Sequence, residues 1–276
     1  MAVFSRSELL MQRELLTNLT LRELRGKYKR SILGWAWSLL NPLASMLIYT
    51  MVFAVILRIN VNPGDPSGLD VFALFLLCGL LPWNFVANSV SGGTEALVSN
   101  ANLIRKVYFP REILVGATVG SFFITLLIEM GVLCLALLIA GNMILPWLLL
   151  AALLLVPLAA FSLGLGLMLS VANVYFRDMR HLVGILLQVW FYLTPIVYPL
   201  TLVPEKSHLG GVTVPTRFLI ELNPMTRFSQ AFRALLYDLR LPSMGSLAYV
   251  LAWSVGTLVA GWWIFKRSEG RLAEEL

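Results

Sequence analysis

The chain has 276 residues, of which 58% are hydrophobic and only 13% are charged. Soluble domains average about 45–50% apolar and about 25% charged residues, so this composition indicates an integral membrane protein. Two cysteines, Cys78 and Cys134, both lie in apolar runs, which excludes a disulfide framework and a cysteine metal site. The first 35 residues are too charged for the apolar core of a cleaved secretory signal.

Residues 1–35 are predicted to form cytoplasmic amphipathic helices at the membrane interface. Thr20 and Glu23 match a capping box, which predicts that a second helix begins at Leu21. Before it, four leucines recur at helical spacing and share one face, as in a helix that lies in the membrane surface. These leucines are Leu9, Leu15, Leu16 and Leu19.

A cluster of cations immediately precedes the first long apolar run. Trp35 and Trp37 follow the cations, and tryptophan is typical of the headgroup level. Cations before a span keep that side in the cytoplasm, so the stretch predicts both the depth and the orientation of the chain. The cations are Arg22, Arg25, Lys27, Lys29 and Arg30.

Six apolar runs are candidates for membrane spans, which need about 20 residues with a range of roughly 17–25. We therefore predict an all-α integral membrane protein with six transmembrane helices, in which residues 36–276 form one transmembrane domain. The fifth run is short and bounded by proline, which is typical of a tilted or incomplete span. The runs are Ala36–Leu57, Val71–Ser91, Ile113–Ala140, Ile144–Val171, Leu182–Pro199 and Leu247–Phe265.

The distribution of Lys and Arg predicts the orientation. An even number of spans places both termini on one side, and with the N-terminus inside the two short outer loops hold only Arg58. The positive-inside rule then predicts that both termini are cytoplasmic, including the tail 266–276. The long outer segment 200–246 also holds cations, but long loops cross the membrane largely regardless of charge.

The cytoplasmic segment before the third span predicts a short amphipathic helix over about residues 97–110. Pro110 suits the first turn of the helix that follows, where a missing N–H costs nothing. Four apolar residues have the spacing of a buried helical face, and two cations lie beside them. The apolar residues are Leu103, Ile104, Val107 and Tyr108, and the cations are Arg105 and Lys106.

The outer segment 200–246 is predicted to contain helices that lie on, or dip into, the outer leaflet. Asn223 and Pro224 have the pattern of an N-cap and a first helical residue. An apolar stripe and a polar face then alternate at helical spacing. The stripe is Met225, Phe228, Phe232, Leu235 and Leu239, and the polar face is Arg227, Gln230, Arg233 and Tyr237.

Small residues in the last span, Ala252, Gly256 and Ala260, are four apart, which predicts close approach of another helix. Glu129 is the only ionisable residue well inside a span. An intramembrane acid indicates function by default, and a satisfied packing carboxylate is the alternative. The two histidines, His181 and His208, are interpreted as solvated. No G-x-x-x-x-G-K-[ST] motif occurs, so the chain binds no nucleotide through a P-loop.

Five segments, in order and on the predicted sides of the spans, resemble one family. They are LRGKYKRSILGWAWSLLNPL, NANLIRKVYFPREIL, VYFRDMRHL, YLTPIVYP and LNPMTRFSQAFR. The chain is similar to the permease subunit of bacterial ABC exporters for polysaccharides of the O-antigen, capsule and teichoic acid type. Each motif alone is weak, but the set covers nearly the whole chain.

The resemblance implies a homodimeric permease of the bacterial inner membrane with two copies of a separate ATPase, which bind the ATP and Mg. It implies that the segment around Leu97–Tyr108 is the coupling helix, that the stretch before the first span is a cytoplasmic gate, and that the outer helices form an external gate. The cargo is then a lipid-linked glycan. No nucleic acid is implied, and no cofactor or metal is expected in this chain.

Three hypotheses assign residues to this function. Aromatic faces stack on sugar C–H surfaces, so aromatic residues of the first and fifth runs are candidates for the glycan path. Cations at the cytoplasmic headgroup level are candidates for the pyrophosphate of the carrier lipid, with Arg25 the best single candidate because Arg–phosphate contacts can be bidentate. The path residues are Tyr49, Phe53, Trp190, Phe191, Tyr192 and Tyr198; the pyrophosphate residues are Arg25, Lys27, Lys29 and Arg30; the outer-gate residues are Asn223, Arg227, Phe228 and Arg233.

Each hypothesis has a simpler alternative. The aromatic residues could be packing or lipid-facing side chains, the cations a topology anchor, and the outer helix a segment that rests on the leaflet. An ABC permease for a drug or small lipid, an ion-coupled secondary transporter that uses Glu129, and a membrane assembly protein also remain open.

Overall fold

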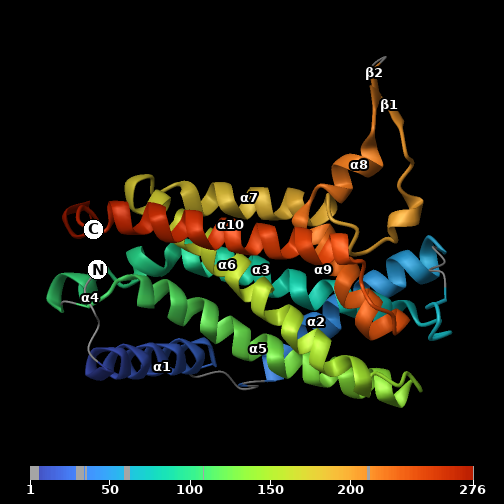
Figure 1. Ribbon diagram of the computed structural model, residues 1–276, viewed down its shortest axis with the longest axis horizontal. Helices are drawn as coiled ribbons and strands as arrows, with labels where there is room; N and C mark the ends of the chain where they lie inside the picture. The colour runs from blue at the N-terminus through green and yellow to red at the C-terminus, as the bar shows by residue number, and fades with distance from the viewer. Residues whose placement is uncertain are drawn as a thin grey trace.

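The computed structural model describes residues 6–28, 34, 36–58, 63–107, 109–209 and 212–275. Trp35, Lys29, Arg30 and Tyr108, which carry sequence-based hypotheses, lie outside these residues. Long helices run side by side along the molecule (Figure 1). The helices are α1 (Arg6–Tyr28), α2 (Ala36–Tyr49), α3 (Phe72–Ser99), α4 (Ala101–Lys106), α5 (Glu112–Ile139), α6 (Leu148–Tyr175), α7 (Met179–Tyr192), α8 (Thr216–Glu221), α9 (Pro224–Arg233), α10 (Met244–Ser268) and α11 (Leu272–Glu275).

Shorter elements complete the chain. The π-helix η1 (Thr50–Ile56) extends α2, and η4 (Ala234–Asp238) extends α9. The 3₁₀ turns are η2 (Leu145–Trp147) and η3 (Leu200–Leu202), and the strands β1 (Ser207–Leu209) and β2 (Val212–Val214) pair antiparallel with His208 opposite Thr213. This hairpin stands away from the helices (Figure 1) and is the one departure from an all-helical fold in the described residues.

Five helical segments among the described residues are long and apolar enough to cross a membrane. The predicted fifth span is not one of them, so the prediction of six spans is not confirmed. Its helix, α7, has 14 residues, a length of about 21 Å against a hydrocarbon core of about 30 Å. Pro195 explains the early end, because a residue before proline is driven out of the helical region. The five segments are Leu39–Ile56, Phe72–Ser99, Glu112–Ile139, Leu145–Tyr175 and Met244–Ser268.

The core lies around α3, which packs against α5 and α6, while α6 packs against α10. Leu76, Val86 and Leu97 of α3 are fully buried along its length. Glycines allow the closest approaches, since a Cβ atom on Gly261 would collide with the backbone of Gly164 in α6. The helices therefore meet backbone to backbone at this crossing.

The close contact of α10 uses a different face from the one predicted. Ala252 and Gly256 are exposed and line an outward groove of about 430 Å³ together with Ala260, whereas Gly261 and Thr257 are buried against α6. Ala252, Gly256 and Ala260 therefore do not form the close contact of α10 with α6 within this chain. Both faces of α10 carry small residues, and helical spacing alone does not choose between them.

The N-terminal segment is one helix and not two. The hydroxyl of Thr20 donates to the carbonyl of Leu16, 2.7 Å away, so Thr20 bonds within a continuous helix and does not cap a new one. The helix lies along α5, where Gly116 and Gly120 face Leu16 and Thr20. The helix α1 therefore packs against two glycines that lie one turn apart on α5.

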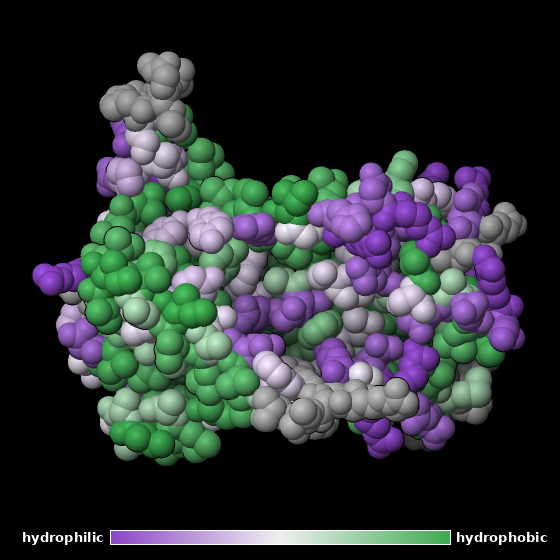
Figure 2. Space-filling view, turned by 180° about the vertical axis from the view of Figure 1, so that it is seen from behind, coloured by the Kyte–Doolittle hydropathy of each residue, from purple (hydrophilic) through white to green (hydrophobic). Residues whose placement is uncertain are grey.

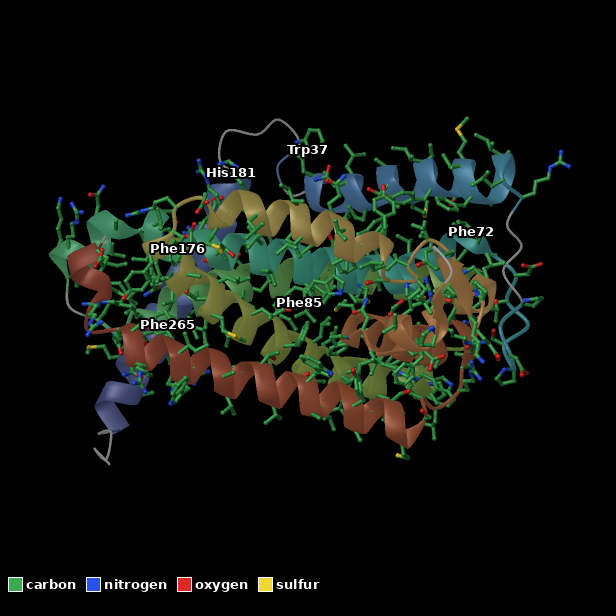
Figure 3. All side chains as sticks on the ribbon, turned by 90° about the horizontal axis from the view of Figure 1, so that it is seen from above. Trp37, Phe72, Phe85, Phe176, His181 and Phe265 are labelled. Carbon is green, nitrogen blue, oxygen red and sulfur yellow. The ribbon has the colours of Figure 1, made fainter. Side chains whose placement is uncertain are left out.

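The termini and the short helix α4 gather at one end of the molecule (Figure 1). Viewed from above, Phe176, His181 and Phe265 lie toward this end, Phe72 lies at the other end, and Trp37 lies between them (Figure 3). At about 42 Å each, α3 and α5 are longer than the hydrocarbon core is thick. The helix α1 packs along α5, and α4 follows directly after α3.

The crossing of α6 and α10 generates a stability prediction. Gly261→Leu should destabilise the protein by about 1–3 kcal/mol, because the added side chain has no space against Gly164. Gly256→Leu is the matched control, since nothing lies within 4 Å of the added Cβ there. The measurement is the thermal unfolding midpoint in detergent, and equal midpoints for the two variants would contradict this crossing.

Candidate functional site

A hollow of about 370 Å³ lies between α2, α3 and α7. Its wall combines aromatic rings with uncharged hydrogen-bonding groups. Figure 2 shows hydrophilic residues gathered in a hollow near the middle of the face turned away in Figure 1. The side chains that give the hollow its chemistry are Ser45 and Tyr49 of α2, Trp83 and Asn84 of α3, and Gln188 and Tyr192 of α7.

The aromatic residues of this wall contact one another. The ring centroids of Tyr49 and Phe191 are 5.8 Å apart, those of Phe191 and Tyr192 are 5.2 Å apart, and those of Trp83 and Phe191 are 5.7 Å apart. Phe53 lies 6.3 Å from Tyr49, one turn along the same helix. The structure therefore brings together four of the six aromatic residues predicted from the sequence, and it adds Trp83.

The remaining two predicted aromatic residues do not line the hollow. The Trp190 ring lies 5.6 Å from that of Trp83 and 6.3 Å from that of Phe161, and its indole N–H donates to the side-chain oxygen of Asn223 at 2.8 Å. The Tyr198 hydroxyl donates to the carbonyl of Tyr192 at 2.9 Å. Both residues support the wall from behind and are not part of its lining.

Asn223 joins the outer segment to α7. It caps α9 as predicted, because its side-chain oxygen accepts from the backbone N–H of Met225 at 3.0 Å. The same oxygen accepts from Trp190, and the Asn223 amide nitrogen donates to the Thr194 hydroxyl at 2.9 Å. One side chain therefore fixes the start of α9 against the end of α7.

Arg233 was predicted on an outward polar face, and the structure corrects this. Its side chain is buried and donates to the carbonyls of Phe75 at 3.3 Å, Pro195 at 2.7 Å and Ile196. The guanidinium also lies 3.7 Å from the centre of the Phe75 ring. Arg233 thus connects α9, α3 and the chain that follows α7.

The other outer-gate candidates are also engaged in the fold. Arg227 is half-buried and pairs with the carboxylate of Glu221 at 3.1 Å, and Phe228 is fully buried 5.8 Å from the ring of Phe161. Because Phe228 and Phe232 are both fully buried, α9 does not simply rest on the outer leaflet.

The coupling candidates lie on and beside α4, which is shorter than the predicted helix because Val107 is already extended. Ile104 is buried within this chain, in a cluster with Leu19 and Leu97. Arg105, Lys106 and Val107 are exposed. Asn102, the two cations and Val107 are therefore the exposed residues of this segment, whereas Ile104 packs within this chain.

Arg25 and Lys27 lie on different faces of α1. Arg25 lines a hollow of about 590 Å³ beside Arg22, whereas the Lys27 ammonium lies 3.1 Å from the centre of the Phe122 ring. Burial lowers the pKa of Lys27 to about 8, although Glu23 and Glu129 act in the opposite direction. Lys27 therefore faces the protein, and only Arg25 of the two is available to an anion.

Arg22 links the helix α1 to the turn before α4. Its guanidinium donates to the side-chain oxygen of Asn100 at 2.7 Å and to Glu23 at 2.8 Å. Asn100 immediately precedes α4. The two predicted functional segments at this end of the molecule are thus in direct contact.

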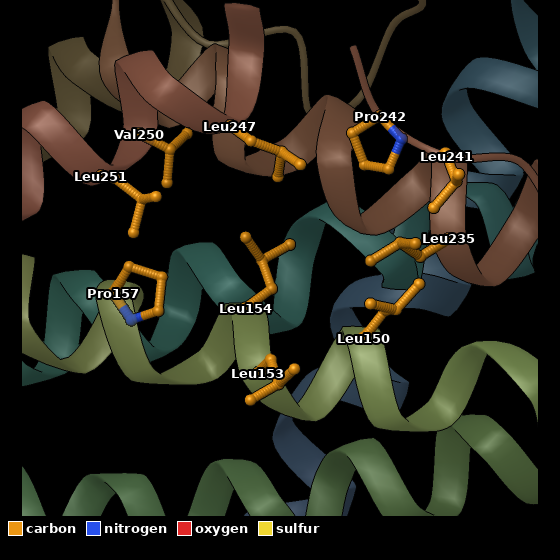
Figure 4. A pocket seen from close by; sticks show the side chains of 10 residues that line it. All are labelled: Leu150, Leu153, Leu154, Pro157, Leu235, Leu241, Pro242, Leu247, Val250 and Leu251. Atoms are coloured by element: carbon orange, nitrogen blue, oxygen red, sulfur yellow. The ribbon is translucent and has the colours of Figure 1, made fainter. Parts of the chain in front are cut away.

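A third hollow, of about 200 Å³, lies between α6, η4 and α10 (Figure 4). Its ten lining side chains are leucine, valine and proline. Such a lining has no hydrogen bond to offer a polar molecule, so this hollow is not part of the candidate site. Among the described residues, no group of His, Cys, Asp or Glu could hold a metal ion.

The sequence model of the ABC-2 type transporter family matches residues 14–237. The chain belongs to this family. It is therefore the membrane-spanning transport component of an ABC transporter and not the ATPase. The family decides against the ion-coupled carrier and the assembly protein that the sequence alone left open.

Several relatives of this ABC-2 protein are named for glycan export. It is 33% identical over 274 residues to the O-antigen export system permease protein RfbA of Myxococcus xanthus, covering 98% of both chains. It is 28% identical over 265 residues to RfbA of Klebsiella pneumoniae, covering 95% of both. It is 28% identical over 232 residues to the polysialic acid transport protein KpsM of Escherichia coli, covering 79% of this chain and 83% of the relative.

Sequence reasoning missed the amide groups of the hollow, Asn84 and Gln188, and the ring of Trp83. The signal was present, since uncharged polar residues inside an apolar run are costly unless they face water or a partner.

Arg233 generates a second prediction. Arg233→Met should destabilise the permease by roughly 3 kcal/mol or more, because it removes three hydrogen bonds from a charged group and leaves buried carbonyls unpaired. Arg227→Met is the control, because Arg227 also makes three hydrogen bonds, to Glu221 and Ser246, but remains partly exposed, where an ion pair contributes about 0–1 kcal/mol. The measurement is thermal stability in detergent; a smaller loss for Arg233→Met than for Arg227→Met would be inconsistent with this account.

Proposed function

We propose that this chain is the permease of an ABC exporter that moves a lipid-linked polysaccharide, of the O-antigen or capsular class, out of the cytoplasm. The observation that carries the proposal is the hollow between α2, α3 and α7, in which aromatic rings and amides face the same space. Aromatic faces and amides are the groups that contact the C–H surfaces and hydroxyls of sugars. The similarity to O-antigen export permeases supports a polysaccharide cargo.

The end of the molecule that carries α1, α4 and the C-terminus is proposed to be cytoplasmic. This end holds Arg22, Arg25, Arg105 and Lys106, together with Lys266 near the end of α10. Such a concentration of cations beside spans is typical of the inner side of a membrane. Both termini would then be cytoplasmic in an inner-membrane protein.

The partners are proposed to be two ATPase subunits, which bind the ATP and Mg, and a second copy of this permease. The exposed cations and Val107 beside α4 are proposed as the surface that docks on the ATPase. Because Arg22 bonds to Asn100 directly before α4, a movement of α4 would be passed to α1, which is proposed as the cytoplasmic gate.

Arg25 is proposed to meet the pyrophosphate of the carrier lipid. It lines the hollow beside Arg22, and a guanidinium offers a bidentate pair of donors to phosphate oxygens. At the other end, α9 is proposed as the external gate, with Asn223 and Phe228 as its points of attachment to the bundle.

The path is tested by removing the two tyrosines that line it. Tyr49→Leu combined with Tyr192→Leu should slow glycan export roughly tenfold or more, because each aromatic contact is worth about 0.5–1.5 kcal/mol beyond its buried area. The measurement is surface glycan, with ATPase co-purification as the assembly check. Trp263→Leu removes a lipid-exposed aromatic from α10 and should export normally. Normal export by the double variant would exclude this path, and export of a drug or small lipid in place of glycan would favour the other cargo class.

The coupling surface is tested by a charge at its exposed apolar residue. Val107→Asp should weaken ATPase binding roughly tenfold or more, because burying a valine contributes about 1.5 kcal/mol or more. The measurement is the dissociation constant of the detergent-purified permease and ATPase. Ile104→Ala is the matched control: it should lower the thermal stability of the permease, since Ile104 packs within this chain, while the ATPase still binds. ATPase binding that is lost in Ile104→Ala and kept in Val107→Asp would reverse the assignment.

A further inference from the structure

We infer that the permease selects glycans whose repeating units carry no negative charge. The inference rests on the proposed function and concerns the lining of the same hollow between α2, α3 and α7. It follows from what the wall contains, from the chemistry of its amides, and from where the cations of the chain lie.

Uncharged polar residues extend from the hollow toward the cytoplasmic end on two helices. On α2, Asn41 lies one turn before Ser45, and on α3, Asn88 lies one turn after Asn84. Both steps lead toward the end that carries α4, because α2 and α3 run in opposite directions (Figure 1). Asn41 and Asn88 are exposed in this chain. We call Asn41, Ser45, Asn84, Asn88 and Gln188 the polar track.

The amides of the polar track have no partner within the described part of the protein. Asn41, Asn88 and Gln188 are exposed and Asn84 is half-buried, and none of these four side chains forms a hydrogen bond among the described residues. An amide without a hydrogen bond in an apolar surrounding costs at least about 1–3 kcal/mol. Four such groups inside membrane-spanning or membrane-level helices therefore indicate that water or a ligand contacts them.

Amides match hydroxyls and do not match anions. Each side-chain amide both donates and accepts, as a sugar hydroxyl does, so the two exchange hydrogen bonds in either direction. A carboxylate only accepts, so it leaves the amide oxygens without a donor, and inside a hollow of low polarity a cation stabilises it far better than neutral amides do. The wall of the hollow contains no lysine or arginine among its described residues.

The aromatic part of the wall also favours neutral sugar units over anionic ones. The faces of Tyr49, Trp83 and Tyr192 carry partial negative charge, which attracts C–H groups and repels carboxylates. Two described cations of α1 lie away from the wall: Arg25 lines the separate hollow on α1, and Lys27 is placed against Phe122. Arg180 lies on α7, two turns before Gln188. Anionic groups are therefore recognised at the mouth, by α1, and neutral sugar units are recognised along the track.

The experiment uses the complete complex of permease and ATPase in proteoliposomes. Two polyprenyl-pyrophosphate-linked oligosaccharides of equal length serve as probes, one built only of hexoses and one in which hexuronic acid alternates with hexose. The initial rate of ATP-dependent translocation is measured for each. We expect the neutral probe to be translocated at least roughly tenfold faster, which corresponds to about 1.4 kcal/mol.

A variant series then locates the selection. Gln188→Arg, which places a cation at an exposed position of the wall, should raise the rate for the uronic acid probe and reduce the preference severalfold. Gln188→Glu, of similar size and opposite charge, should strengthen the preference. Thr201→Arg, at an exposed outer position, controls for a general attraction of anions and should leave the ratio unchanged.

The outcomes separate the inference from the function on which it rests. Equal wild-type rates for the two probes would overturn selection by charge and leave the polysaccharide exporter intact. Translocation of neither probe, with the ATPase bound and active, would count against the proposed function itself. A change of the ratio in Thr201→Arg as large as that in Gln188→Arg would overturn the assignment to the polar track.

Discussion

The buried guanidinium of Arg233 holds α9 against α3 and against the segment that follows α7. A cation in a medium of low polarity costs several kcal/mol unless fixed groups replace its hydration, and Arg233 is supplied with the carbonyls of Phe75, Pro195 and Ile196. Two of these carbonyls belong to the segment in which proline interrupts α7. The interruption that ends α7 after 14 residues is therefore also what provides acceptors for Arg233. The short α7 and the buried α9 are two consequences of one arrangement.

This arrangement connects the outer segment to the wall of the hollow. Asn223 at the start of α9 accepts from Trp190, and the next residue along α7, Phe191, contacts Tyr49 and Trp83 in the wall. A displacement of α9 would act on α7 at two places, through Asn223 and through Arg233. At the opposite end, Arg22 and Asn100 join α1 to α4 in a similar way. Each end of the molecule thus has a segment that is tied to the helices around the path by a few polar contacts.

Local patterns predicted the parts of this fold that obey local rules. The spans around α3, α5, α6 and α10 follow from their apolar runs, and the cap at Asn223 follows from the Asn-Pro pair. Tertiary context decided the rest. Thr20 matches a capping pattern but bonds to Leu16 within a continuous helix. Arg233 lies on the polar face of α9 and is nevertheless buried. Helical spacing identifies which residues share a face, but it does not say what covers that face, and Gly261 and Arg233 both illustrate this.

The chemistry of the path bears on why the chain needs an ATPase. A wall of aromatic faces and amides offers a sugar polymer many contacts of similar, modest strength. Because successive units find nearly equivalent contacts, the polymer encounters no deep minimum and can slide in either direction. Such a wall lets the polymer pass but does not set the direction of transport. This chain has no P-loop through which ATP could drive transport in one direction. In the proposed mechanism, direction comes from cycles of binding and release at the two ends, where polar contacts join α1 to the turn before α4 and α9 to α7.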